Sequence, residues 1–248
     1  MDLGLNGRTA IVCGASSGLG LASAEALAEE GANVVMFARR EELLEHEAQR
    51  IGATAVVGDV REPADIERVV NVALESFGAL DILVPNSGGP PPSRAEEIDA
   101  DDVQAAVELL LLPVVRLVRL ALPHLLASDQ ARIVLISSLA VREPTEHLVL
   151  TNSVRPGVVG YMKSLANELG PKGVTVNSVA PGRIETPRLR ELYGVEGPAA
   201  EQVALIPARR LGEPRELGDL VAFLCSRRAS YISGTHIPVD GGLYRGIL

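Results

Sequence analysis

The stretch Cys13-Gly-Ala-Ser-Ser-Gly-Leu-Gly20 directly follows the apolar run at residues 9–12 and precedes a helical stretch. Its three glycines stand where a first strand turns into a first helix, the place at which doubly wound folds bind a dinucleotide pyrophosphate. Gly14 and Gly18 leave room for the phosphates, and Gly20 lets the helix pack closely on the strand. The first amides of the helix then face the anion. The sequence predicts a dinucleotide site at this turn.

Short β-rich runs alternate with longer helical stretches along the whole chain. Near-continuous apolar strands joined by helical crossovers predict an α/β fold with a parallel sheet covered on both faces. Right-handed crossovers make such a sheet doubly wound, and ligands then bind beyond the carboxyl ends of its strands. The predicted strands lie near residues 8–13, 33–38, 54–58, 81–85, 132–137, 175–180 and 236–239.

Proline and glycine mark several helix ends. Pro63 and Pro214 open two helices that end near residues 78 and 227, and Gly170-Pro171 ends another. These punctuating residues place helices in the gaps between the predicted strands.

The segment at residues 101–126 is apolar nearly all round and includes Leu109-Leu-Leu-Leu112. This pattern indicates a helix buried on two sides rather than an amphipathic surface helix. A second copy of the chain would supply the extra cover, and elements of the same chain are the alternative. We favour a homo-oligomer, either a dimer or a tetramer.

Composition excludes several classes of function. The chain has 248 residues, of which 47% are hydrophobic, so one domain with a large core is expected. A formal net charge of −9 argues against a nucleic-acid partner. Apolar runs stop short of a membrane span and no cationic leader opens the chain, so we expect a cytoplasmic protein. Cys13 and Cys225 are expected to be buried free thiols, and no metal site is expected.

Four further motifs follow the glycine turn: Asn86-Ser-Gly88, Ile136-Ser-Ser138, Pro181-Gly-Arg-Ile-Glu-Thr186 and Asp240-Gly-Gly242. Their order and spacing resemble the short-chain dehydrogenase/reductase family over essentially the whole chain, and its 3-oxoacyl-carrier-protein reductase branch in particular. The resemblance implies one Rossmann domain over residues 1–248 with seven strands in the order 3-2-1-4-5-6-7. It also implies a small-molecule carbonyl or alcohol substrate, with an acyl thioester as one option.

Two arginines follow the second predicted strand, at the distance from the glycine turn where a ribose-binding residue is expected. An acid there would accept a hydrogen bond from a ribose 2′-hydroxyl, whereas Arg39 offers a cation and planar donors that suit a 2′-phosphate. NADP(H) is therefore favoured over NAD(H). The alternative is that Arg39 and Arg40 merely begin an exposed helix with Glu41 and Glu42.

The resemblance implies further cofactor contacts, with the adenine ring near the third strand and the nicotinamide carboxamide near the sixth. The predicted cofactor-binding residues are Gly14, Ser16, Ser17, Gly18, Leu19, Gly20, Arg39, Asp59, Val60, Asn86, Gly88, Ile136, Arg155, Pro181, Gly182, Ile184 and Thr186.

The family's catalytic residues are a serine, a tyrosine thirteen residues later, a lysine four beyond it, and an asparagine on the preceding helix. Here Ser138 is kept, but Thr151, Arg155 and Leu110 stand at the other three positions. An alkyl alcohol is a far weaker acid than a phenol of pKa about 10, so Thr151 is a poor proton donor. Arg155 stays protonated and can bind ribose hydroxyls, but it cannot relay protons as an amine does.

Other residues could replace the missing acid. Tyr161 and Lys163 are two residues apart, about 200° around a helix, so they do not form the required pair. Tyr161 is expected in the core or an interface, and Lys163 in solvent. Pro156 predicts that the helix starts near residues 152–153. His147 is a candidate acid if its loop folds inward, and a solvent-exposed side chain otherwise.

Two segments are predicted to border the substrate. Gly88-Gly-Pro-Pro-Pro-Ser93 forms a stiff wall beside the nicotinamide or simply a rigid connector. Residues 187–205 are expected to form a helical substrate lid. Two functions remain open: an atypical NADP(H)-dependent carbonyl or alcohol oxidoreductase, and a dinucleotide-binding sensor or subunit without turnover.

Overall fold

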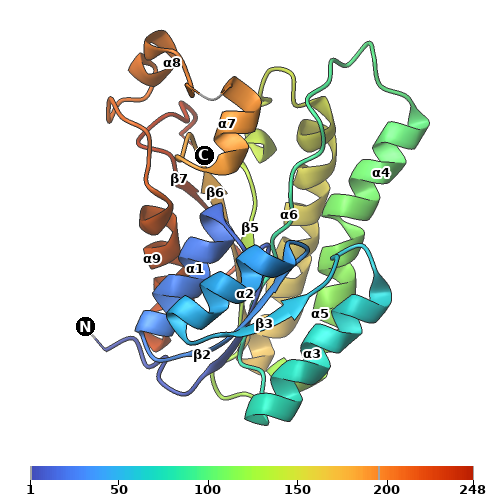
Figure 1. Ribbon diagram of the computed structural model, residues 1–248, viewed down its shortest axis with the longest axis vertical. Helices are drawn as coiled ribbons and strands as arrows, with labels where there is room; N and C mark the ends of the chain where they lie inside the picture. The colour runs from blue at the N-terminus through green and yellow to red at the C-terminus, as the bar shows by residue number, and fades with distance from the viewer. Residues whose placement is uncertain (1, 195, 248) are drawn as a thin grey trace.

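The computed structural model describes residues 2–194 and 196–247, and its centre is one parallel sheet (Figure 1). The strand order is β3-β2-β1-β4-β5-β6-β7. This confirms the predicted order, and each strand lies within about two residues of its predicted bounds. The strands are β1 (Thr9–Cys13), β2 (Asn33–Ala38), β3 (Thr54–Val57), β4 (Ile82–Val84), β5 (Arg132–Ile136), β6 (Thr175–Pro181) and β7 (His236–Val239).

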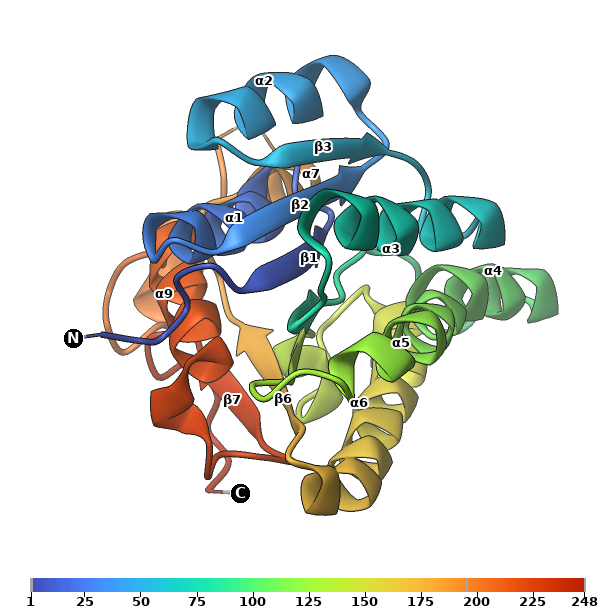
Figure 2. The same cartoon turned by 90° about the horizontal axis from the view of Figure 1, so that it is seen from below.

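Helices cover both faces of the sheet (Figure 2). The helices α1, α2 and α9 pack on one face, while α3, α4, α5 and α6 pack on the other. Their bounds, with those of the two short helices near the carboxyl edge, are α1 (Gly18–Glu29), α2 (Glu41–Ile51), α3 (Pro63–Phe77), α4 (Ala100–Leu110), α5 (Leu112–Leu125), α6 (Val149–Leu169), α7 (Pro187–Tyr193), α8 (Ala200–Ala204) and α9 (Pro214–Cys225).

Successive side chains of the buried strands point alternately into two separate hydrophobic cores. In β1, Ile11 and Cys13 belong to the core under α3–α6, whereas Ala10 and Val12 belong to the core under α1, α2 and α9. Both faces of a central parallel strand are therefore dry, which explains why the strands read as continuous apolar runs. Cys13 and Cys225 are free, as predicted, and burial raises the pKa of each thiol to about 12.

The predicted single helix at residues 101–126 is in fact two helices. α4 ends at Leu110 and α5 begins at Leu112, with Pro113 in the first turn of α5. Proline has no amide hydrogen to donate and is tolerated in a helix's first turn, so the chain restarts its helix there. Across the described ranges, no helix combines the length and apolarity that a bilayer crossing needs.

The prediction for the start of α6 was wrong. The helix begins at Val149, so Pro156 lies in its interior rather than in its first turn. The extra turn is held by Asn152, whose side chain accepts from the Thr145 amide at 3.0 Å and donates to the Thr145 carbonyl at 2.9 Å. These two hydrogen bonds fix the loop before α6 and offset the loss of the helical hydrogen bond that Pro156 cannot make.

Residues 187–205 do not form one helix. They fold as α7 and α8, separated by Gly194 and Gly197, which have positive φ angles of 86° and 76°. Such angles break a right-handed helix and favour glycine. Val195, within this segment, lies outside the described residues.

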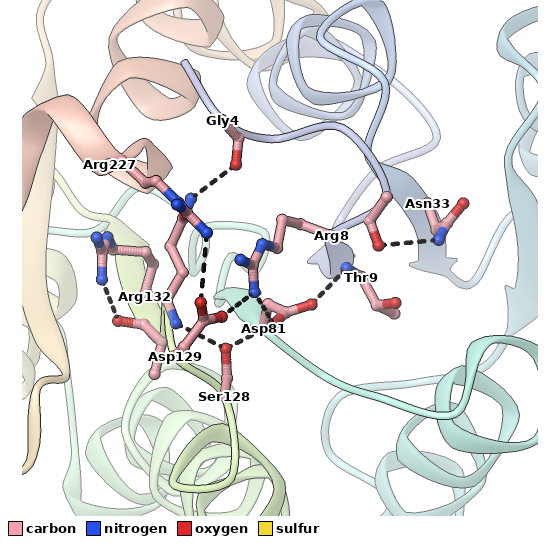
Figure 3. A network of polar contacts seen from close by, with 12 residues as sticks. Gly4, Arg8, Thr9, Asn33, Asp81, Ser128, Asp129, Arg132 and Arg227 are labelled. Carbon is pink, nitrogen blue, oxygen red and sulfur yellow. Dashed lines mark hydrogen bonds and ion pairs between the residues drawn. The ribbon is translucent and has the colours of Figure 1, made fainter. Parts of the chain in front are cut away.

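A polar network closes the amino-terminal edge of the sheet (Figure 3). The buried Asp81 carboxylate accepts from the Thr9 amide at 2.8 Å, from Arg8 Nη1 at 3.1 Å and from the Ser128 hydroxyl. Arg8 also bonds to Asp129, which pairs with Arg227 at 3.3 Å. Asp81 thus joins the starts of β1, β4 and β5 at one buried charge.

We predict that Asp81→Ala lowers the free energy of unfolding by about 1–3 kcal/mol, because it leaves the buried Thr9 amide without its acceptor. Urea unfolding followed by circular dichroism measures the change. Asp129→Ala, which removes an exposed carboxylate from the same network, is the control and should cost less. Equal losses in both variants would contradict the central role of Asp81.

Candidate functional site

The predicted site residues gather at the carboxyl edge of the sheet. The glycine turn follows β1, Asn86 follows β4, Ser138 follows β5 and the loop with Thr186 follows β6. α7 and α8 lie at this end of the molecule (Figure 1). Because the strands are parallel, turns far apart in the sequence converge at one edge, as ligand binding in this architecture requires.

The glycine turn is shaped by contacts that exclude side chains. Gly14 and Gly18 have φ angles of 61° and 58°. A Cβ on Gly20 would lie 2.3 Å from the Gly14 carbonyl oxygen, and one on Gly14 would lie 2.6 Å from Asn86 Nδ2. Asn86 also donates to the Cys13 carbonyl at 3.2 Å, so the end of β4 holds the turn in place. The Ser17 side chain does not cap α1, which leaves the helix's first amides for an anion.

Arg40, rather than Arg39, lies against the glycine turn. Its Nη2 donates to Ser16 Oγ at 3.1 Å and also to Ser17 Oγ. Arg39 points toward the end of β3, where Nη1 lies 4.0 Å from Asp59 Oδ2, and its side chain is 66% exposed. Both arginines follow β2, and Arg39 is the one predicted to bind the phosphate. Arg40 is the N-cap residue of α2, and the direction of its side chain depends on that turn.

The Asp59 carboxylate is occupied by Arg61. Arg61 donates to both Asp59 oxygens, with Nη2 and Oδ2 2.6 Å apart. The hydrogen bond from the Arg61 side chain lowers the pKa of Asp59, against the opposing effect of its partial burial. The Asp59 amide donates to Asp65 at 2.9 Å, and Val60 packs against the α3–α6 core. This corner is therefore a fixed wall of the site.

Two of the predicted catalytic residues, Ser138 and Arg155, meet near the end of β5, and Thr151 lies one helical turn before Arg155. Ser138 Oγ accepts from the Ala140 amide at 3.1 Å, which leaves the hydroxyl hydrogen free to donate. Thr151 is only 6% exposed in the first turn of α6. One turn later, Arg155 Nη1 donates to the Ile136 carbonyl at 3.3 Å, two residues before Ser138.

Arg155 is a half-buried cation. Burial, followed by the positive charge of Arg188, lowers the pKa of Arg155 to about 10. No carboxylate pairs with its guanidinium in the described part of the chain. A guanidinium with one carbonyl acceptor still has donors for a ligand.

A cavity of about 10 Å³, enough for roughly one water molecule, lies beside the Arg155 side chain. It is also bordered by Asn86 and Ser87. On the α4–α5 side its lining side chains are apolar: Leu110, Pro113, Val114 and Leu117. Leu110 therefore offers no polar group where the resemblance would place an asparagine.

The other candidate proton donors lie elsewhere. The His147 side chain is 57% exposed and pairs with Glu146 at 3.4 Å, while the His147 carbonyl accepts from the Ser93 amide at 2.8 Å. Its catalytic role stays a prediction. Tyr161 packs against the α3–α6 core, where burial raises the pKa of its phenol. Lys163 is exposed and donates to the Gly234 carbonyl at 3.0 Å.

The loop after β6 is rigid. The Gly182 amide donates to the Val239 carbonyl at 2.9 Å, and a Cβ on Gly182 would lie 2.6 Å from the Asp240 Cβ. Thr186 Oγ1 accepts from the Leu189 amide at 3.2 Å and so caps α7. Ile184 is buried, and its segment pairs with Gly212. These contacts place the first turn of α7 over the glycine turn, because a Cβ on Gly18 would lie 3.5 Å from Thr186.

Two arginines tie α7 and α8 to the site. Arg188 Nη2 donates to the Pro90 carbonyl at 2.7 Å, which joins α7 to the proline-rich loop after β4. Arg183 Nη2 donates to Gln202 Oε1 at 2.6 Å, and its guanidinium lies 5.9 Å from the centre of the Tyr193 ring. Arg188 on α7 and Gln202 on α8 are therefore each held by a hydrogen bond to a residue outside the two helices.

Comparison with known proteins gives consistent matches. The family model described as enoyl-(acyl carrier protein) reductase matches residues 14–244. The chain is 35% identical to the 3-oxoacyl-[acyl-carrier-protein] reductase FabG of Vibrio cholerae, over 98% of this chain and 99% of that protein. It is 33% identical to the oxidoreductase UcpA of Escherichia coli K12, over 96% of this chain and 95% of that protein.

Solved structures match equally well. The L-sorbose reductase of Gluconobacter frateurii, complexed with NADPH and L-sorbose, superposes with a TM-score of 0.93 at 32% identity and covers 100% of both chains. An NADPH-bound short chain oxidoreductase of Pseudomonas aeruginosa PAO1, described as containing an atypical catalytic center, gives a TM-score of 0.89 at 34% identity. That match covers 96% of this chain and 97% of the other.

We predict that Arg183→Ala speeds cleavage after Glu191 and Glu201 by a glutamyl endopeptidase several-fold, because the variant loses the Gln202 hydrogen bonds that pin α8. Gel analysis of a digestion time course under native conditions measures the rate. Arg94→Ala, which breaks only an exposed ion pair with Glu96, is the control. If both variants are digested like the parent protein, Arg183 does not hold the segment.

Proposed function

The chain belongs to the short-chain dehydrogenase/reductase family, and on that premise we propose that it is an atypical NADP(H)-dependent reductase of a small carbonyl compound. The observation that carries the proposal is the convergence of Ser138 and Arg155 on the end of β5, beside a glycine turn with uncapped helix amides. Solved relatives at 32% and 34% identity bind NADPH, which supports the cofactor.

The residues of the glycine turn fit a dinucleotide. The α1 amides would hold the pyrophosphate, while Arg40, directed by Ser16 and Ser17, would pair with a 2′-phosphate. Arg39 lies one residue away at the end of β2 and adds positive charge to the same corner. Two arginines, rather than an acid, directly after β2 favour NADP(H) over NAD(H).

When bound, the nicotinamide supplies a hydride to an electron-poor carbon, so the protein must place that carbon and stabilise its oxygen. Ser138 donates a hydrogen bond to the substrate oxygen, because the Ala140 amide already occupies one of the hydroxyl's acceptor positions. Arg155 adds positive charge as the oxygen becomes anionic. The oxygen takes its proton from solvent, since Thr151 is too weak an acid.

Other features of the proposal concern access and assembly. Residues 187–205 act as a lid over the substrate, and Arg188 links them to the loop after β4. Val103, Leu120 and Leu126 are exposed apolar residues on α4 and α5 or beside them, and they would be covered in a homo-oligomer. The Arg188 hydrogen bond supports the lid, and the exposed apolar side chains support the homo-oligomer.

A second candidate function is cofactor binding without turnover. Thr151 and Leu110, at positions where the family has a phenol and an amide, favour it. Titrating NADPH and NADH by fluorescence, and then following nicotinamide absorbance over ketones, acyl thioesters and alcohols, separates the two functions. Turnover of any of these compounds supports the reductase. Tight NADPH binding without turnover of any compound supports the second candidate function.

We predict that Arg40→Ala raises the Kd for NADPH by about 10- to 100-fold, as expected for losing a charged hydrogen bond. The Kd for NADH should change little, since NADH has no 2′-phosphate. Fluorescence titration measures both constants. Arg39→Ala is the matched control and should have the smaller effect. A similar loss for both nucleotides would place Arg40 in support of the turn rather than on the phosphate.

We predict that Ser138→Ala lowers kcat by about 100-fold with little change in the Kd for NADPH, because it removes one donor to the developing oxyanion. Ser137→Ala is the control, since the Ser137 hydroxyl is buried without a hydrogen-bond partner. Steady-state kinetics on a substrate found in the panel measures both variants. Unchanged turnover in Ser138→Ala would remove the serine from the reaction.

A further inference from the structure

Arg155 and Arg188 bring two guanidiniums to one short loop. Arg155 borders the cavity formed at Pro85–Ser87, while Arg188 Nη2 donates to the Pro90 carbonyl at 2.7 Å. Arg188 Nη2 also lies 2.9 Å from where a Cβ on Gly89 would be. Three residue steps separate Ser87 from Pro90, so their Cα atoms are at most about 11 Å apart. The two cations therefore flank the same stretch of backbone.

The loop is open to solvent at Gly88. A Cβ added to Gly88, at the centre of this loop, would meet no atom within 4 Å. Gly88 is also exposed, whereas Pro90 beyond it is buried. A ligand group can therefore approach this loop at Gly88 without displacing protein atoms.

Carboxylates in the described part of the chain compensate only one of these two charges. Arg155 has no carboxylate partner among the described residues, and its identified acceptor is the Ile136 carbonyl. Arg188 pairs at 3.0 Å with Glu191, a 64% exposed residue on the same helix, so its charge is compensated only at the surface. The charge of Arg188 further disfavours the cationic form of Arg155. Two like charges beside a half-buried pocket are costly unless an anion joins them.

We propose that Arg155 and Arg188 bind a carboxylate that the substrate carries next to its reducible carbonyl, so that the substrate is a 2-oxo carboxylate. This inference rests on the proposed reductase function. A planar guanidinium matches a carboxylate with two parallel hydrogen bonds. Ribose hydroxyls could also accept from Arg155, but they are neutral and would leave the charge of Arg155 uncompensated.

The position of Arg155 orients the substrate. It bonds to the carbonyl of Ile136, two residues before Ser138, so a carboxylate held by Arg155 places the neighbouring carbonyl near the Ser138 hydroxyl. The carbonyl carbon accepts the hydride that reduced nicotinamide supplies, and its oxygen takes a proton from solvent. The product is a 2-hydroxy carboxylate together with the oxidised nucleotide.

Calorimetric titration of the NADP⁺-loaded protein tests the proposal without turnover. The probes are pyruvate, 2-oxobutanoate and benzoylformate, each with its methyl ester as the neutral match. We expect at least one acid to bind about 10-fold or more tightly than its ester, which is the effect of one compensated charge. If no acid binds more tightly than its ester, the proposal is overturned.

Variants identify the residues responsible. Arg188→Gln should weaken binding of the acid about 10-fold or more and leave the ester unchanged. Arg155→Gln should weaken binding of the acid about 10-fold more than binding of the ester, whereas Arg155→Lys should keep most of the preference. Arg190→Gln is the control, since Arg190 is exposed on α7 and pairs with Glu185. Equal effects on acid and ester would overturn the assignment to these arginines.

The test separates this proposal from the function on which it rests. Reduction of neutral ketones with no preference for acids would overturn the carboxylate site and leave the reductase function standing. Failure to bind NADP⁺ or NADPH would instead overturn the reductase function. Nucleotide binding is therefore measured first, on the parent protein and on each variant.

Discussion

The carbonyl oxygen of Gly14 occupies the space that a side chain on Gly20 would need, and much of the structure follows from that contact. It sets how closely α1 approaches the end of β1, and Asn86 fixes the same turn by bonding to the Cys13 carbonyl. One turn thus joins the first strand, the fourth strand and the first helix. The helix amides are left facing the ligand, because the protein supplies no side-chain cap for them. The site therefore consists of unsatisfied backbone donors at the carboxyl edge of the sheet, where the turns after several strands meet.

The chemistry that we propose for the second half of the site is electrostatic. Where the family has a phenol and an amine, this chain has a buried alcohol and a guanidinium. A guanidinium stabilises negative charge well and transfers protons poorly. The arrangement therefore suits reactions in which the carbon is already activated by a neighbouring electron-withdrawing group, so that less help is needed at the oxygen. Leu110 and its apolar neighbours are consistent with this, since they line a cavity that holds little water.

The sequence predicted the sheet closely because buried parallel strands are continuous apolar runs, and it predicted α3 from Pro63 and Gly78. It failed where tertiary contacts overrode local preference. Pro156 sits inside α6 because Asn152 secures the turn before it, a contact that no local pattern encodes. Arg39 and Arg40 are equivalent in the sequence, and only the turn into α2 decides which one reaches Ser16. Arg155 lies on α6 and Arg188 on α7, so sequence spacing alone could not reveal that the charge of Arg188 acts on Arg155.

The two cysteines lie in the two different cores: Cys13 in the core under α3–α6, and Cys225, the last residue of α9, in the core under α1, α2 and α9. Neither thiol contacts solvent, and both are held in the unreactive protonated form. Alkylation of each therefore requires its own layer to separate from the sheet. Each side of the central sheet thus has one thiol whose alkylation rate reports local opening. The two rates would tell whether the helical layers separate from the sheet together or one before the other.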